Sequence, residues 1–519
     1  MDILATLSDD PKFCLLAGLP LILIITVTLK TLVFHPLARY PGPFLGRFTD
    51  LYAGYYAWKG TLHVDMYRCH QKYGPIVRYG PNRLLIDTHT AAQDVHSHRA
   101  NTIKSRAYQA LVHSAPNTLT IRHKEDHARR RRVLSLAFSD ARMLGYESTV
   151  KGCIQALCDN LRKSSVAKDD SARDSLIDMS FQSDWFTFDI MSEVIFGMKY
   201  EALKNSTYRH VTQAIQDSNV RVGTLVQAYS LTTARLDRYL FPASIQARNA
   251  FLKFITSLLR DRSKMTVSQD KGDVFSFLET AKDPDNGKTL TKSEIRAECA
   301  TLVVAGSDTS SSTLAATLFY LSENPGPYKR VCEEIRGKFA SLDEIKLGSQ
   351  LNSCTYLRAC IDEALRMSPP VGGALWREVG PGGITIGSTH LPQGVDVGTG
   401  IYSLHHNASY FDEPFRFNPE RWLAGENGVR KEQVSLARSA FHPFSSGPRG
   451  CIGKGFAYHE MTLTLSHIIY QFDFHRAEHP AGGVAGKSQR PMVQGHVQFV
   501  LKDHITGAKE GPELRFIPR

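Results

Sequence analysis

A lone thiol stands in the ten-residue stretch FSSGPRGCIG, among three glycines, one proline and one arginine. A cysteine thiolate is a soft, electron-donating group that haem iron accepts as an axial ligand. Glycines let backbone N–H groups approach the sulfur and hold its charge, an arginine pairs with a haem propionate, and a phenylalanine packs beside the sulfur. The alternative is a surface turn with a buried cysteine. The order F-x-x-G-x-R-x-C-x-G favours a haem-thiolate site built from Phe444, Gly447, Arg449, Cys451 and Gly453.

A second candidate site is the polar run AGSDTS, residues 305–310, inside the apolar stretch CATLVVAGSDTSSSTLAATLFYL. Polar residues in the middle of a long buried helix need a reason. One reason is a local break at Gly306, where freed backbone groups meet water or dioxygen and Asp308 and Thr309 pass protons. The other is an N-cap that starts a new helix at Asp308 or Thr309. The cysteine loop downstream favours proton transfer.

Two further motifs combine charged residues at helical spacing. Glu363 and Arg366 of EALR face one side of a helix, which alone would be a surface ion pair worth under about 1 kcal/mol. A third charged residue, Arg421 of NPERW, follows downstream. In HARRRR, His127 and Arg131 share a helix face, and both are expected to reach the propionates of a haem held by the cysteine loop. The remaining three, Arg129, Arg130 and Arg132, form either a solvated face or a docking surface for an acidic electron donor.

Long helices are expected to position these residues. Helical periodicity covers 122–139, 176–203, 292–323, 324–340, 355–367 and 453–470, and short strand-like pieces lie near 75–87, 384–402 and 495–517. The predicted fold class is mainly α with small β-sheets (α+β), and the 453–470 helix would place Cys451 near a helix N-terminus. The net charge of +11 suggests an acidic partner, but no zinc-finger, homeodomain or RNA-binding motif points to nucleic acid.

The N-terminus predicts a membrane anchor. Residues 13–29 carry no charge and as a helix would span roughly 26 Å, close to an endoplasmic-reticulum bilayer core of about 27 Å. The alternative, a cleaved signal peptide, lacks a small-residue cleavage site here. The predicted organisation is a lumenal N-terminus over 1–12, a transmembrane anchor over 13–34, a proline-rich linker over 35–46 and a catalytic domain over 47–519. Lysine and arginine after the span, and nine scattered cysteines with no C-x-x-C pair, place that domain in the cytosol.

With these motifs in this order, residues 35–519 resemble the cytochrome P-450 superfamily, the haem-thiolate monooxygenases. HHNASYFDEPFRFNPERW and YPGPFL are similar to fungal microsomal members, including trichothecene hydroxylases. The resemblance implies haem b with Cys451 as axial ligand, and an acid–alcohol pair, Asp308–Thr309, that supports cleavage of dioxygen. It also implies a buried structural triad of Glu363, Arg366 and Arg421. By family position, the substrate pocket is lined by parts of 104–118 and by Val303, Val304, Ala305, Val371, Ala374, Leu375 and Ile505.

The expected function is oxygen activation: one oxygen atom enters a lipophilic secondary metabolite, most simply as a hydroxyl group, and the other leaves as water. The chain has no G-x-G-x-x-G unit for a flavin or nicotinamide, so the NADPH electrons are expected from a separate cytochrome P-450 reductase, with cytochrome b5 as an optional second donor. Oxidative phenol coupling, desaturation and ring chemistry are alternatives on the same haem. A haem-thiolate isomerase or dehydratase that uses no dioxygen, and an anchored haem sensor or carrier, are rivals from other classes.

Overall fold

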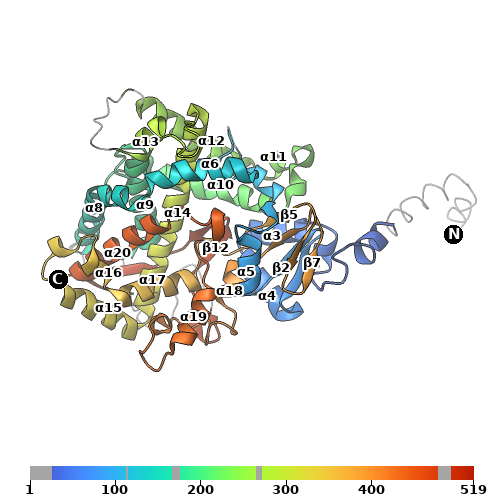
Figure 1. Cartoon of the computed structure of the whole chain (residues 1–519). Helices are drawn as coiled ribbons and strands as arrows, with labels where there is room; N and C mark the ends of the chain where they lie inside the picture. The colour runs from blue at the N-terminus through green and yellow to red at the C-terminus, as the bar shows by residue number, and fades with distance from the viewer. Residues whose placement is uncertain (1–25, 113–114, 166–175, 263, 265–271, 477–491) are drawn as a thin grey trace, which may run out of the picture.

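Helices dominate the computed structural model, which describes residues 26–112, 115–165, 176–262, 264, 272–476 and 492–519 (Figure 1). Residues 26–32 are helical. The named α-helices are α3 (Leu51–Lys59), α4 (Leu62–Tyr73), α5 (His89–His96), α6 (Lys124–Ala137), α7 (Asp140–Gly145), α8 (Glu147–Ser165), α9 (Met179–Phe196), α10 (Arg209–Gln227), α11 (Asp237–Leu240), α12 (Pro242–Arg262), α13 (Val274–Thr280), α14 (Lys292–Glu323), α15 (Pro325–Lys338), α16 (Ser349–Asn352), α17 (Thr355–Met367), α18 (Ile401–His405), α19 (Lys431–Ser439) and α20 (Lys454–Gln471). The predicted helical class with small sheets is confirmed.

The strands of the described residues form five small sheets. The largest has the order β1 (Ile76–Gly80), β2 (Arg83–Ile86), β8 (Asp396–Gly398), β5 (Arg377–Val379) and β3 (Thr102–Lys104), with only β2 and β8 parallel among its neighbours. A three-stranded sheet joins β4 (Ile177–Asp178), β14 (Glu513–Pro518) and β9 (Phe472–Arg476). Three hairpins pair β6 (Ile384–Ile386) with β7 (Thr389–Leu391), β10 (Met492–Val493) with β11 (His496–Val497), and β12 (Leu501–His504) with β13 (Thr506–Lys509). Figure 1 shows the largest sheet beside α3, α4 and α5, on the side of the molecule away from α8, α9 and α20.

Helix α14 runs through the middle of the helical part (Figure 1). Its 32 residues span about 48 Å, and it begins with a capping box between Thr291 and Glu294. It packs on α9, α17 and α20. The predicted break at Gly306 and the alternative N-cap at Asp308 or Thr309 are both wrong, because the helix continues through these positions.

The polar stretch of α14 is compatible with a helix because several of its hydroxyl groups bond to carbonyls one turn back in the same helix. Thr309 Oγ1 donates to the Ala305 carbonyl at 2.6 Å, and Thr317 Oγ1 to the Thr313 carbonyl at 2.8 Å. Gly306 provides a close contact instead of a break. A Cβ atom there would lie 2.4 Å from Met191 Cε, so the glycine lets α9 approach α14.

The predicted anchor falls largely outside the described residues, which begin at 26. In the part of the chain that the structure describes, no helix combines the length and apolar character needed to cross a membrane.

The segment predicted as a linker lies against the largest sheet. Leu37 is fully buried, the Arg78 amide donates to the Pro41 carbonyl at 2.8 Å, and Arg78 Nη1 donates to the Thr31 carbonyl at 2.8 Å.

Candidate active site

The cysteine loop forms a tight turn before α20. The Cys451 amide donates to the Phe444 carbonyl at 2.8 Å, and the Gly450 amide to the Gly447 carbonyl at 3.0 Å. Gly447 has a φ of 68°, and a Cβ atom there would lie 1.9 Å from the His96 carbonyl oxygen. Among the described cysteines, only Cys451 is exposed, and it opens onto an internal cavity of about 920 Å³.

Several donors around the Cys451 sulfur favour its charged form. Burial raises the pKa of Cys451, while the Gly453 backbone N–H, Arg131 and Lys454 act in the opposite direction. The sulfur also precedes α20, whose N-terminus favours negative charge. The Phe444 ring lies 5.0 Å from the Tyr458 ring, which fixes it beside the loop. The loop therefore presents a sulfur that a metal ion would hold as a thiolate.

Asp308 and Thr309 face different surroundings. Thr309 lines the cavity, whereas Asp308 is buried behind it and accepts hydrogen bonds from Asn219 Nδ2 at 2.8 Å and Thr506 Oγ1 at 2.6 Å. Burial raises the pKa of Asp308 to about 6. Asn219 and Thr506 themselves line the cavity, so they connect the Asp308 carboxyl to it.

Three cations line the cavity near the cysteine loop: Lys104, Arg377 and Arg449. Lys104 and Arg377 are direct cross-strand partners in the β3–β5 ladder, where like charges repel. Burial, and then Arg377 and Arg449, lower the pKa of Lys104 well below its usual value. Among the described residues, none of the three pairs with a carboxylate. They donate instead to the backbone carbonyls of residues 119, 121, 122, 375 and 376.

His127 and Arg131 lie beside this cation cluster but do not line the cavity. Burial, and then Arg449 and Lys104, lower the pKa of His127 to about 3. Arg131 Nη1 donates to the Gly450 carbonyl at 2.7 Å and so holds the cysteine loop. The excess of positive charge, next to a single accessible thiol in a large cavity, fits haem, whose two propionates would supply the missing anions.

The three residues of the predicted triad meet in the core. Both Glu363 oxygens accept from Arg366, at 2.9 Å each, and Oε1 also accepts from Arg421 Nε at 3.0 Å. Burial acts to raise the pKa of Glu363, but Arg366 and Arg421 hold it below its usual value. Sequence reasoning missed Trp422, whose indole N–H donates to Glu363 Oε2 at 3.0 Å. Arg366 also donates to the carbonyls of residues 405 and 414, so the group joins α17 to the chain before the cysteine loop.

Six of the seven residues named for the substrate pocket line the cavity: Val304, Ala305, Val371, Ala374, Leu375 and Ile505. The expectation is wrong for the seventh, Val303, which lies in the core. Helices α10 and α12, which the sequence did not predict, add further apolar lining, such as Val222 and Ile255. In the sequence, these two helices are indicated by an amphipathic pattern over 209–227 and 242–262. The many polar residues in the same regions make this pattern hard to recognise.

The three remaining arginines of α6 have acidic partners within the chain. Arg129 and Arg130 both pair with Glu294, at 2.8 and 2.9 Å, and Arg132 Nε pairs with Asp283 at 2.8 Å. Arg129 and Arg130 are mostly buried, so they do not form a solvated face either. The solvated-face alternative is wrong for Arg129 and Arg130, whereas Arg132 is partly exposed. All three pair with acidic residues of the α13–α14 region, and docking of an electron donor stays a prediction.

Comparison with known proteins defines the class to which this fold and site belong. The sequence profile described as "Cytochrome P450" matches residues 36–482, so the chain belongs to the cytochrome P450 family. It is 49% identical over 488 residues to the cytochrome P450 monooxygenase poxM of Penicillium oxalicum, covering 93% of this chain and 91% of poxM. It is 61% identical over 376 residues to apf8 of Gibberella fujikuroi, covering 72% of this chain and all of apf8. With AKT7 of Alternaria alternata it shares 44% identity over 510 residues, 96% of each chain. The chain is a cytochrome P450 monooxygenase, a family whose cofactor is haem with a thiolate ligand.

Proposed function

We propose that this protein oxidises a lipophilic secondary metabolite, by hydroxylation, with dioxygen and with electrons that NADPH supplies through a separate cytochrome P450 reductase. Cytochrome b5 is an optional second donor. The observation that carries the proposal is one cavity lined by the Cys451 thiol, by Thr309 and by three cations near the cysteine loop that have no carboxylate partner among the described residues. The similarity to fungal monooxygenases over most of the chain supports it.

Each part of the cavity has a task in this proposal. Haem, when bound, supplies the activation of dioxygen. Cys451 would be its axial ligand, and Lys104, Arg377 and Arg449 would hold its propionates. Thr309 would hold a proton donor in place at the cavity wall. Asp308 would exchange protons with the cavity through the Thr506 hydroxyl, with Asn219 holding the carboxyl in place, and burial keeps its pKa, about 6, close to neutral pH.

The lining limits the class of substrate. Apart from the cations near the cysteine loop, the wall near α14 and the 370–375 segment consists mainly of small or apolar side chains. Such a wall suits an aromatic, polyketide or terpenoid body. Phenol coupling, desaturation and ring chemistry would use the same residues and remain alternative outcomes on such a substrate.

Thr309→Val is expected to cut product formation more than NADPH consumption, because without an ordered proton donor the electrons end in hydrogen peroxide. Asp308→Asn should do the same to a smaller extent, since Asp308 does not line the cavity. The measurement is the ratio of product to NADPH and to hydrogen peroxide, with reductase present. The substrate for it comes from comparing metabolites of strains with and without the gene.

Thr317→Val is the matched control for this experiment. It removes the same kind of hydroxyl-to-carbonyl bond from α14, at a fully buried position that does not line the cavity. Its product-to-NADPH ratio should equal that of the wild type. Equal losses of product and NADPH use in Thr309→Val would instead place Thr309 in folding or electron transfer, and unchanged turnover under nitrogen would favour an isomerase.

We also propose that residues 13–34 anchor the protein in the endoplasmic-reticulum membrane, with the catalytic domain in the cytosol. The support is the charge-free run over 13–29. Deletion of residues 1–30 should release a protein that keeps its haem and leaves the membrane fraction on carbonate washing. The cut spares Thr31, whose carbonyl accepts from Arg78. A truncated chain that still sediments as an integral membrane protein would contradict a single anchor.

A further inference from the structure

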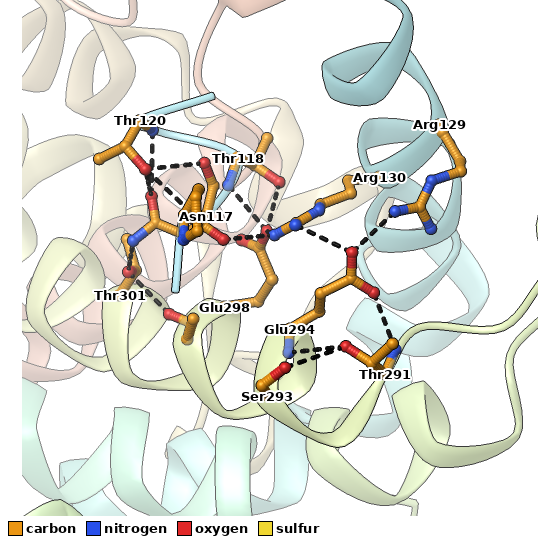
Figure 2. Close-up of polar contacts among 12 residues, drawn as sticks. Asn117, Thr118, Thr120, Arg129, Arg130, Thr291, Ser293, Glu294, Glu298 and Thr301 are labelled. Atoms are coloured by element: carbon orange, nitrogen blue, oxygen red, sulfur yellow. Dashed lines mark hydrogen bonds and ion pairs between the residues drawn. The ribbon is translucent and has the colours of Figure 1, made fainter. Parts of the chain in front are cut away.

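The segment 115–121 forms part of the cavity wall and is tied to α14 by a buried carboxylate (Figure 2). It has no helix or strand of its own, but Asn117 and Leu119 line the cavity. Glu298 Oε1, on α14, accepts from the Thr118 backbone N–H at 2.7 Å and from Thr118 Oγ1 at 2.8 Å. The position of this part of the wall therefore depends on Glu298.

Arg130 secures Glu298 from α6. Its Nη1 lies 3.3 Å from Glu298 Oε1 and also donates to the Pro116 carbonyl, and its Nη2 pairs with Glu294 at 2.9 Å. Figure 2 shows the Glu298 carboxylate between Thr118 and Arg130, and Arg130 in turn between Glu298 and Glu294. Glu298 and Arg130 are 2% and 7% exposed, so removal of the carboxylate would leave buried donors without an acceptor.

The hydrogen-bond pattern around Asn117 determines which way its amide faces. The Thr120 backbone N–H points at one amide atom at 3.1 Å, and because an N–H only donates, that atom is the oxygen. The nitrogen Nδ2 therefore faces Thr301 Oγ1, 2.6 Å away. Thr301 gives its only hydroxyl proton to the Ala297 carbonyl at 2.8 Å, so it accepts from Asn117. Thr120 and Thr301 therefore require the same orientation of the Asn117 amide.

In this orientation, only one of the two amide hydrogens of Asn117 has an acceptor among the described residues. Among the described residues, Nδ2 has Thr301 as its acceptor and no second one. Asn117 and Thr301 both line the cavity, together with the apolar side chains of Leu119, Ala300 and Val304. A donor in such surroundings favours a ligand that brings an acceptor oxygen to it.

We propose that Asn117 binds an acceptor oxygen of the substrate, a carbonyl, ether or hydroxyl oxygen, and that Glu298 is the positioning residue that holds Asn117 at the cavity wall. The proposal rests on the proposed function in that the substrate enters this cavity. It adds the chemical class: a lipophilic compound with an acceptor oxygen away from the carbon that is oxidised. Thr301 contributes by fixing the amide.

The test compares two probes with the same skeleton, 4-phenylcyclohexanone and phenylcyclohexane, which differ in one acceptor oxygen. Binding to the haem-loaded protein is followed by the change in the spin-state spectrum of the haem, without reductase. One net hydrogen bond changes an equilibrium constant by about 2- to 10-fold. We expect the ratio of ketone to hydrocarbon affinity to fall by that factor in Asn117→Leu, with the hydrocarbon affinity maintained.

Asn117→Asp is a second variant of the same shape, which keeps the acceptor for Thr120 but cannot donate when ionised. It should lose the ketone preference too. Glu298→Leu should lower the ratio like Asn117→Leu, and Glu298→Gln should restore it, because its amide oxygen still accepts from Thr118. Glu294→Leu is the matched control: it removes the other partner of Arg130 without touching residues 115–121, so the ratio should stay at the wild-type value.

An unchanged ratio in both Asn117 variants, or a wild-type protein that binds the ketone no better than either variant does, would overturn the proposal. Equal effects of Glu294→Leu and Glu298→Leu on the ratio would reduce Glu298 to a structural role. Because the measurement needs neither reductase nor turnover, loss of ketone preference is distinguishable from failure of the proposed oxidation. Binding to a protein without oxidation activity would still test whether Asn117 binds the ketone oxygen.

Discussion

Replacement of Cys451 by serine is expected to abolish the red-shifted Soret band that the reduced, carbon-monoxide-treated protein should show. A serine hydroxyl is a hard and weakly acidic group that does not replace a thiolate on iron, although it fits the same turn. Turnover should fall to background with the band. Circular dichroism of the same sample should show a helical content like that of the wild type, because serine keeps the backbone hydrogen bonds of the turn.

Cys332→Ser is the matched control for this prediction. Cys332 lies in α15, is 6% exposed, and burial raises its pKa, so it behaves as a small core residue. This variant should keep the band at wild-type intensity per haem. A normal band in Cys451→Ser would move the ligand to another residue and refute the site built around the cysteine loop.

Arg366→Ala is expected to destabilise the protein by about 3–5 kcal/mol, because it leaves Glu363 as a buried charge without its main partner. Both side chains are fully buried, and the pair joins α17 to the segment that precedes the cysteine loop. The free energy of folding of a domain is commonly about 5–15 kcal/mol, so the loss would be a large fraction of the total. The measurements are the yield of haem-loaded protein and the urea midpoint.

An exposed pair of the same geometry provides the comparison. Arg416 and Glu413 stand at the same i, i+3 spacing, 2.8 Å apart, and both side chains are 54% exposed. Arg416→Ala should change stability by less than about 1 kcal/mol. If the two alanine variants lose the same stability, burial does not decide the strength of the Glu363 group.

The parts of the site that the sequence predicted depend on short-range spacing. The cysteine loop is defined by five positions within ten residues, and Glu363 and Arg366 by one helical turn, so local pattern was sufficient for both. Five long helices, α6, α14, α15, α17 and α20, were predicted within a few residues for the same reason, whereas α9 ends well before the predicted 203, and α8, α10 and α12 were not predicted. The break at Gly306 was wrong because hydroxyl groups can bond to the carbonyl one turn back, and sequence alone does not tell this from a break.

The parts that the sequence did not predict depend on contacts between distant segments. Lys104 and Arg377 become neighbours only through the pairing of β3 with β5, and neither belongs to a motif. The direction of Asp308 is set by Asn219 and Thr506, which come from α10 and β13. The α6 arginines pair with acidic residues of the α13–α14 region, which lie far from α6 in the sequence. The sequence therefore showed their charge but not these pairings.

The like-charged Lys104 and Arg377 pair has a consequence for how the chain matures. Two cations that face each other across a ladder weaken the edge of a sheet unless an anion joins them. The cofactor would then act as a counterion that completes the β3–β5 edge, in addition to its chemistry. We therefore expect the β3–β5 pairing to be less stable in a chain made without haem, so that cofactor delivery and protein yield would be linked.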